Sequence, residues 1–207
     1  MDWGDLKIII GRKVNDPGAT KYAASLLDNF NAAQRILAAT HTGLTLASDY
    51  TGDGETTQFP LPSNCVSNRI HGVYDVTEDI WLTKVFFYPG QALDEGYYVW
   101  PDGMINFSPA IADDSVYRLH YVAYYPEMTG DDSEIVIPNW AIEAAVLYTA
   151  GRTLEDYGSQ MAILGQFRTR VDSGNPEDQP VLTLSRRYIE QFYELLNRHP
   201  APQYDML

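Results

Sequence analysis

Four histidines are the side chains best suited to acid–base chemistry or to binding a transition metal. They are His41, His71, His120 and His199, and no two of them are separated by two or four residues. Metal sites and catalytic triads need such groups beside a nucleophile or further ligands. The chain also lacks a G-x-S-x-G elbow, a G-x-x-x-x-G-K-[ST] loop and a G-x-G-x-x-G motif. These patterns predict that the protein is not an enzyme and uses no cofactor or metal.

Residues 49–55 imitate the start of a calcium-binding loop. Asp49 and Asp53 stand at its first and fifth positions, and Gly54 stands at the sixth. The twelfth position, which supplies a bidentate glutamate in calcium sites, is Pro60. We therefore favour a polar turn that leads into a strand. Cys65, the only cysteine, excludes an intrachain disulfide.

Four pairs of adjacent acids would suit a glycosidase, in which two carboxylates flank the scissile bond. Adjacent residues of a strand point to opposite faces, however, and each pair falls at an expected turn. We interpret these acids as solvated loop charge. The pairs are Glu78-Asp79, Asp94-Glu95, Asp113-Asp114 and Asp131-Asp132.

The charge of the 207-residue chain is concentrated in its middle. The net charge is −14, from 28 acidic and 14 basic residues. Residues 45–136 contain 15 of the acids, only 3 of the bases and 15 of the 26 aromatic residues. Residues 1–44 are nearly balanced, and residues 137–207 contain 9 acids and 6 bases. We expect the middle to be an insert that is built differently from its flanks.

The N-terminal flank has helical periodicity. Apolar side chains at helical spacing predict an amphipathic helix over residues 22–41, after a turn at Asn15–Gly18. Residues 3–13 predict a shorter helix. The inward side chains would be Leu26, Phe30, Ala33 and Leu37 in the longer helix, and Trp3, Leu6, Ile9 and Ile10 in the shorter one.

The C-terminal flank is also helical in pattern. Pro138 fits the first position of a helix that extends to residue 157, and a second apolar stretch covers residues 163–167. Pro180 opens a last helix. Its inward stripe would be Val181, Leu184, Tyr188, Phe192 and Leu195.

The middle segment reads as short strands. Pro101-Asp102-Gly103 is a turn signal that predicts a hairpin of Tyr97–Trp100 with Met104–Phe107. Residues 116–125 alternate between apolar and polar side chains. Further strands are expected at residues 58–61, 70–76 and 81–88.

These elements predict an α+β fold in which the N- and C-terminal helices form a helical bundle with an inserted antiparallel β-sandwich or barrel-like domain. The expected parts are residues 1–44, 45–136, 137–199 and a tail, 200–207. No apolar run reaches the roughly 18 residues of a membrane span, so we expect no membrane partner. The first residues also predict no secretory signal.

Two stretches of the chain resemble the head-to-tail adaptor, or connector, proteins of tailed bacteriophages. In residues 14–35 the likeness lies in a turn followed by a helix pattern. The second stretch is Ile135–Pro138 and the small-residue-rich helix Trp140–Tyr157, and residues 52–62 also resemble strand openings of phage virion proteins. The matching residues of the first stretch are Asn15, Asp16, Thr20, Leu26, Leu27, Asn31, Ala33 and Arg35.

The resemblance implies a structural virion protein at the head–tail interface. Adaptors of this kind form a ring of twelve copies beneath the portal protein, receive a tail, stopper or nozzle protein on the other side, and let DNA pass without sequence-specific binding. An acidic lumen would suit that passage, because like charge does not hold phosphates. The alternative is that the acids lie on the outer surface and keep the protomer soluble.

The resemblance also directs attention to two sets of residues. The candidates for docking on the portal are Tyr204, Met206, Leu207, Arg186 and Arg187, and the candidates for an acidic lumen are Asp75, Glu78, Asp79, Asp94, Glu95, Asp113 and Asp114. A second hypothesis is a glycan-binding or tail protein of the virion, in which aromatic side chains such as Trp81 or Trp100 form a sugar platform.

Overall fold

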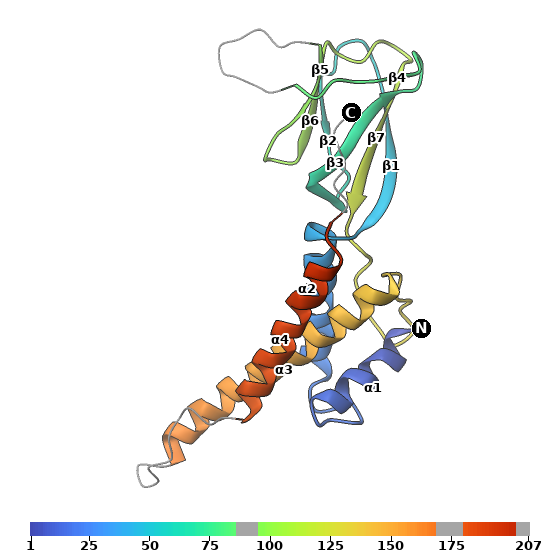
Figure 1. The fold of residues 1–207 in the computed structure, drawn as a ribbon. Coiled ribbons are helices and arrows are strands. Elements are labelled where there is room, and N and C mark those ends of the chain that lie inside the picture. The colour runs from blue at the N-terminus through green and yellow to red at the C-terminus, as the bar shows by residue number, and fades with distance from the viewer. Residues whose placement is uncertain (86–94, 169–179, 202–207) are drawn as a thin grey trace. The chain divides into compact units, whose positions relative to one another are not determined.

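The computed structural model describes residues 1–85, 95–168 and 180–201. These residues form two compact units. A helical unit comprises Met1–His41 and Tyr125–Ala201, and a β unit begins at Thr42 and ends at Tyr124. Figure 1 traces the chain through both units, and each unit is described here by itself.

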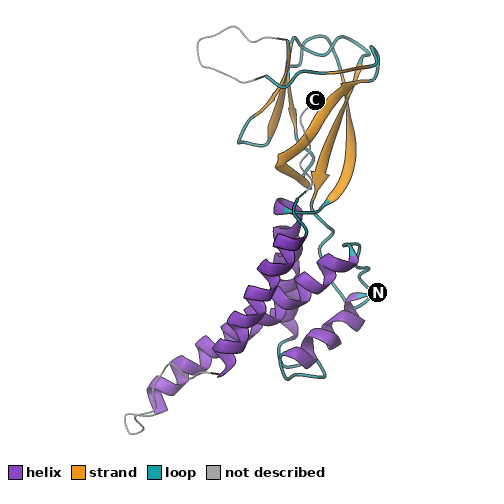
Figure 2. Ribbon diagram, viewed as in Figure 1, coloured by secondary structure: helices purple, strands orange, loops and turns teal. Residues whose placement is uncertain are grey.

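The described residues of the helical unit form four helices: α1 (Trp3–Lys13), α2 (Ala23–Thr40), α3 (Asn139–Arg168) and α4 (Pro180–Arg198). Figure 2 shows the helices in purple. The predicted α+β class is confirmed: helices come before and after the antiparallel sheets along the chain. No helix among the described residues is long and apolar enough to cross a membrane.

The core between α1 and α2 follows the predicted spacing. Leu26, Phe30, Ala33 and Leu37 are completely buried, and the Trp3 ring lies 5.0 Å from the Phe30 ring between centroids. The Asp2 carboxylate accepts a hydrogen bond of 2.9 Å from the Asp5 N–H and so caps α1. One expectation is wrong: Ile9 is 41% exposed, because the buried face of α1 passes through Leu6 and Ile10.

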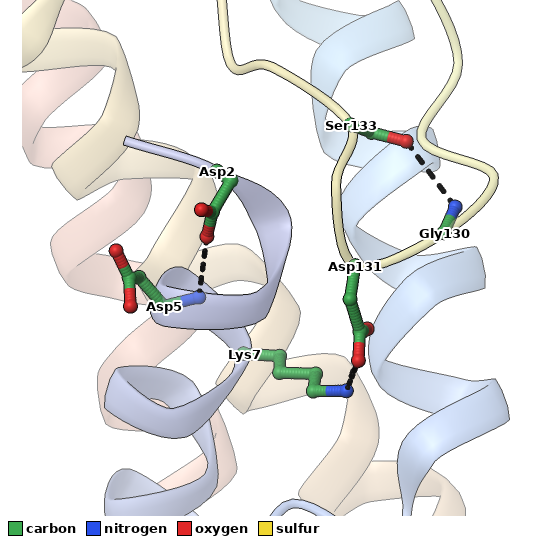
Figure 3. A network of polar contacts seen from close by, with 6 residues as sticks. All are labelled: Asp2, Asp5, Lys7, Gly130, Asp131 and Ser133. Carbon is green, nitrogen blue, oxygen red and sulfur yellow. Dashed lines mark hydrogen bonds and ion pairs between the residues drawn. The ribbon is translucent and has the colours of Figure 1, made fainter.

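The start of the chain is held by the segment that precedes α3 (Figure 3). The Trp3 N–H donates to the Ser133 carbonyl and the Gly4 N–H to the Asp131 carbonyl, both at 2.9 Å. The Lys7 ammonium also lies 2.6 Å from the Asp131 carboxylate.

The sequence pattern placed the end of the insert at residue 136, whereas the compact β unit ends at Tyr124.

Polar side chains of α2 hold the same connecting segment. The Asn31 side-chain amide donates to the Met128 carbonyl at 3.0 Å, and its oxygen accepts from the Met128 N–H at 2.8 Å. Arg35 forms an ion pair with Glu127. Two residues of the adaptor-like pattern therefore fix the chain where it returns from the β unit.

α3 and α4 pack closely along their lengths (Figure 1). α3 is one continuous helix, so the two expected stretches, 138–157 and 163–167, belong to a single element. In α4 the predicted inward stripe is rotated: Ser185, Phe192 and Leu196 are buried, while Leu184 is 37% exposed.

The rotation of α4 has a packing cause at Gly151. A Cβ added there would lie 2.9 Å from Ile189 side-chain atoms and 3.1 Å from the Ser185 carbonyl oxygen. The Ser185 hydroxyl donates to the Gly151 carbonyl at 2.8 Å. A small polar side chain therefore faces α3 at a close approach of the two helices, which apolar periodicity does not reveal.

In the β unit, the described residues form two antiparallel sheets that enclose one core (Figure 2). The first sheet has the strand order β1 (Leu44–Thr51), β7 (Val116–Ala123), β3 (Cys65–Asp75) and β4 (Ile80–Trp81). The second has the order β2 (Gln58–Pro60), β6 (Met104–Ser108) and β5 (Gly96–Val99). Both sheets contribute to the core through Val73, Leu119, Tyr97, Ile105 and Phe107.

The predicted strands agree with the structure in part. The hairpin around Gly103, which has φ +83°, is confirmed as β5 and β6. Of the strand expected over residues 81–88, Trp81 lies in β4 and Lys84 forms an isolated bridge to Tyr97, while residues 86–88 lie outside the described residues. β1 was not predicted.

The half-buried Cys65 has its pKa raised to about 11 by burial, so its thiol stays protonated at neutral pH.

Candidate interaction surfaces

One end of the β unit collects acidic side chains from four connections. Thr51 pairs with Val116, Asp75 with Tyr117, and Gly96 with Ser108, so the loops beside these pairs lie at the same end of the two sheets. This is the end away from the Leu44–Ala123 pair, next to which the chain enters and leaves the unit. We call it the acidic end. Its described acids are Asp53, Glu55, Asp75, Glu78, Asp79, Glu95, Asp113 and Asp114.

No base neutralises these acids from the same loops. Residues 51–58, 75–80, 95–96 and 108–116 contain no lysine, arginine or histidine. The acids named here other than Asp75 are exposed or half-exposed. Burial raises the pKa of Tyr117, and the nearby charges of Asp75, Glu78 and Glu95 raise it further. The acidic end therefore carries a negative potential.

Of the predicted lumen acids, five are exposed at this end: Glu78, Asp79, Glu95, Asp113 and Asp114. Asp75 differs from them, because it is only 5% exposed. Its carboxylate accepts hydrogen bonds from the Thr77 N–H at 2.8 Å and the Glu78 N–H at 3.0 Å, and thus fixes the β3–β4 turn. Asp94 lies outside the described residues.

The calcium-like segment is used for other contacts. Asp49 lies in β1 and forms a two-point ion pair with Arg118, at 2.7 and 2.9 Å. The hydrogen bonds that Thr56 donates are the main reason why the pKa of Asp53 is lowered to about 2. Among the described residues no group of three or more potential ligands is placed to hold a metal ion.

We predict that Ca²⁺ gives no saturable heat below millimolar concentration in a calorimetric titration of the protein. Asp49 is engaged by Arg118, and the bidentate glutamate of a calcium loop is replaced by Pro60. An Arg118→Ala variant, which frees the Asp49 carboxylate, serves as the comparison. A micromolar site in the unaltered protein would contradict the prediction.

An aromatic surface lies on the outer face of the first sheet. Trp81 is 55% exposed, and its ring lies so close to Gly72 that a Cβ added there would be 3.0 Å from it. Its centroid lies 5.2 Å from the Tyr74 ring and 5.3 Å from the His120 ring. A cavity of about 360 Å³ is lined by Trp81 together with Asp75, Glu95 and Tyr117.

The candidates for portal docking are only partly described. Arg186 and Arg187 are exposed in the first turns of α4, and no ion pair to an acid is formed by either of them within the described part of the chain. Tyr204, Met206 and Leu207 lie outside the described residues.

A comparison with protein families decides the relationship of the chain. Residues 1–187 match the SU10 adaptor protein family, so the match spans both the helical and the β units. The chain belongs to the SU10 adaptor protein family. No curated protein matches the sequence.

SU10 adaptor proteins are head-to-tail adaptors of phages, which confirms the resemblance drawn from the sequence. This SU10 adaptor is accordingly a structural component of the phage virion. A structural role also agrees with the expectation of a non-enzymatic protein.

Proposed function

We propose that this SU10 adaptor assembles as a ring of twelve copies beneath the portal, at the head–tail interface, and joins it to a tail, stopper or nozzle protein. DNA would pass through the ring without sequence-specific contacts. The observation that carries the proposal is the family match over residues 1–187. The division into a helical and a β unit supports it, because an adaptor must present separate surfaces to two partners.

In this proposal the C-terminal part of the chain docks on the portal. Arg186 and Arg187 are exposed cations in a protein of net charge −14, and so are suited to an acidic partner surface. Tyr204, Met206 and Leu207 would supply apolar anchors. A short apolar segment that binds a partner gains most of its contact energy from such anchors.

The acidic end would line the path of the DNA. Each exposed carboxylate repels the phosphates, and the loops supply no base that would attract them. DNA would therefore slide past the wall without being held. If the acids instead face outward, they affect solubility and leave DNA movement unchanged.

Changing Glu78, Glu95 and Asp113 together to lysine is expected to slow or arrest DNA ejection. The changes reverse the charge of three exposed side chains, and lysines bind phosphates. Ejection kinetics from virions measure the effect at two salt concentrations, since phosphate binding weakens as salt rises. The matched control places lysines at Asp28, Glu143 and Glu194, which are exposed in the helical unit. Unchanged ejection in the first variant would reject the lumen assignment.

The test of the proposed function is to mix the full-length protein with portal rings from the same phage and to image them by electron microscopy. We expect an added ring beneath the portal, whose symmetry gives the copy number. A variant that lacks residues 200–207 should keep its circular dichroism spectrum and fail to attach. Bare portals at high concentrations of the full-length protein would contradict the proposal, and normal attachment of the truncated variant would contradict the role of the tail.

A second candidate function rests on the exposed ring of Trp81. An exposed tryptophan beside carboxylates and a cavity is typical of a sugar-binding surface. Glycan-array binding that is lost on Trp81→Ala and kept on Trp100→Ala would favour this function. Absence of binding to any glycan would remove it.

A further inference from the structure

A groove in the helical unit lies where its four helices meet. Its volume is about 290 Å³. The end of α1, the turn before α2, the middle of α3 and the start of α4 all contribute to it. The principal lining residues are Lys13, Lys21, Tyr22, Leu154, Tyr157 and Leu184.

The floor and walls of the groove are apolar and aromatic. Leu154 is nearly buried, whereas Leu184 is 37% exposed at the rim. The rings of Tyr22 and Tyr157 meet edge to face at 5.5 Å between centroids. Such a surface is suited to one large apolar side chain, because burial there removes apolar area from water on both partners.

The rim of the groove is basic. The Lys21 ammonium lies 4.3 Å from the Tyr157 ring centroid and 4.7 Å from that of Tyr22. The Lys13 ammonium lies 5.6 Å from the ring centroid of Tyr188, a residue of α4. Both lysines are exposed, and their ammonium groups are placed over aromatic faces.

Within the part of the chain that the structure describes, these cations have no carboxylate partner of their own. The ion pairs among described residues involve Lys7, Arg35, Arg118 and Arg152, and none involves Lys13 or Lys21. The nearby Asp16 carboxylate is directed to the N–H groups of Lys21 and Tyr22 instead, at 2.8 and 3.1 Å. Arg187 lies one turn beyond Leu184 on α4 and is a further exposed cation that forms no ion pair among the described residues.

We propose that this groove binds an acidic segment of another virion protein, with a large apolar side chain in the groove and carboxylates against Lys13 and Lys21. The inference rests on the proposed function, because an adaptor must hold proteins other than itself. Charge complementarity decides the chemistry of the occupant. In a chain of net charge −14, an apolar groove edged by cations that form no ion pair among the described residues selects an anionic partner.

Photo-crosslinking in assembled virions tests the inference. Benzoylphenylalanine replaces Leu184 at the rim of the groove, and in a control it replaces Glu194, an exposed residue ten positions further along α4. Mass spectrometry identifies the peptide joined to each position. We expect the Leu184 position to capture a segment of a different virion protein that contains two or more acids beside a large apolar residue.

Charge reversal at Lys13 and Lys21 is the second part of the crosslinking experiment. The double change Lys13→Glu and Lys21→Glu should lower the crosslink yield at Leu184 by about ten-fold or more, because two attractive contacts become repulsive. Arg198→Glu, at the other end of α4 and also without an ion pair among described residues, is the matched control and should leave the yield unchanged. Reversing the acids of the captured segment should restore the yield.

Four results would overturn the inference while the protein is present in virions. They are no crosslink at Leu184, a crosslink to DNA, a crosslink to a second copy of this chain, and a yield that is insensitive to the Lys13 and Lys21 changes. Absence of the protein from purified virions would instead overturn the proposed function. The two failures are therefore distinguishable.

Discussion

Replacing Gly52 by alanine is expected to prevent the β unit from folding stably. Gly52 is buried just after β1, and a Cβ there would lie closer than 3.0 Å to the carbonyl oxygens of both Ile111 and Ala112. Its N–H also donates to the Ser115 carbonyl at 2.9 Å, so the backbone has little room to move away. Overpacking against fixed backbone of this kind costs about 3 kcal/mol, the upper end of the usual range.

Gly103→Ala is the matched control for Gly52→Ala. Gly103 has φ +83° and no atom within 4 Å of an added Cβ, so only the left-handed backbone conformation opposes the change. We expect a loss of about 1 kcal/mol. If the two alanine variants lose equal stability, the close approach at Gly52 does not restrict that position.

Replacing Phe30 by alanine should destabilise the helical unit by about 3–5 kcal/mol. Phe30 is completely buried in α2, and its ring contacts the ring of Trp3 in α1. The change leaves a cavity and also removes the main aromatic contact of Trp3. Ile9→Ala, on the exposed side of α1, is the control and should change stability by less than about 0.5 kcal/mol.

Fluorotryptophan labelling lets both predictions be measured in the same chain. Trp3 and Trp140 report on the helical unit, and Trp81 and Trp100 report on the β unit. Fluorine NMR during urea unfolding should show the Trp81 and Trp100 signals shifted to lower urea in Gly52→Ala. In Phe30→Ala the Trp3 and Trp140 signals should shift. A shift of the other pair in either variant would contradict the separate cores.

The elements that the sequence predicts well are those whose burial is set by local periodicity. α2 buries the residues at its predicted spacing because one face meets a continuous core. The β5–β6 hairpin is similarly determined by its own turn, with Gly103 at positive φ. In both cases the residues that decide the structure are neighbours along the chain.

The elements that the sequence does not reveal depend on distant partners. β1 is a sheet edge whose polar Asp49 pairs with Arg118, 69 residues away, so it lacks a clear apolar alternation. The face of α4 is likewise chosen by Gly151 and Ser185, because close helix packing needs small residues at that point.

The candidate surfaces were likewise predictable only where residues close together in the sequence determine them. The acidic end was predictable in composition, since its acids fall in turns between strands. The burial of Asp75 was not recognised, although aspartate is favoured in turns because its side chain can accept hydrogen bonds from N–H groups that follow it. The basic groove was missed because its residues come from four separate elements, and only the packing of the helices places Lys13 beside Tyr188.

The pairing of Leu44 with Ala123 has a consequence for how the chain can be altered. The first and last strands of the β unit are hydrogen-bonded neighbours, so its two ends lie about 5 Å apart between Cα atoms. The β unit could therefore be removed or exchanged as one piece. A two-residue linker would bridge the gap that its excision leaves at these ends, and a transplanted β unit would require only that its host loop offer two adjacent attachment points.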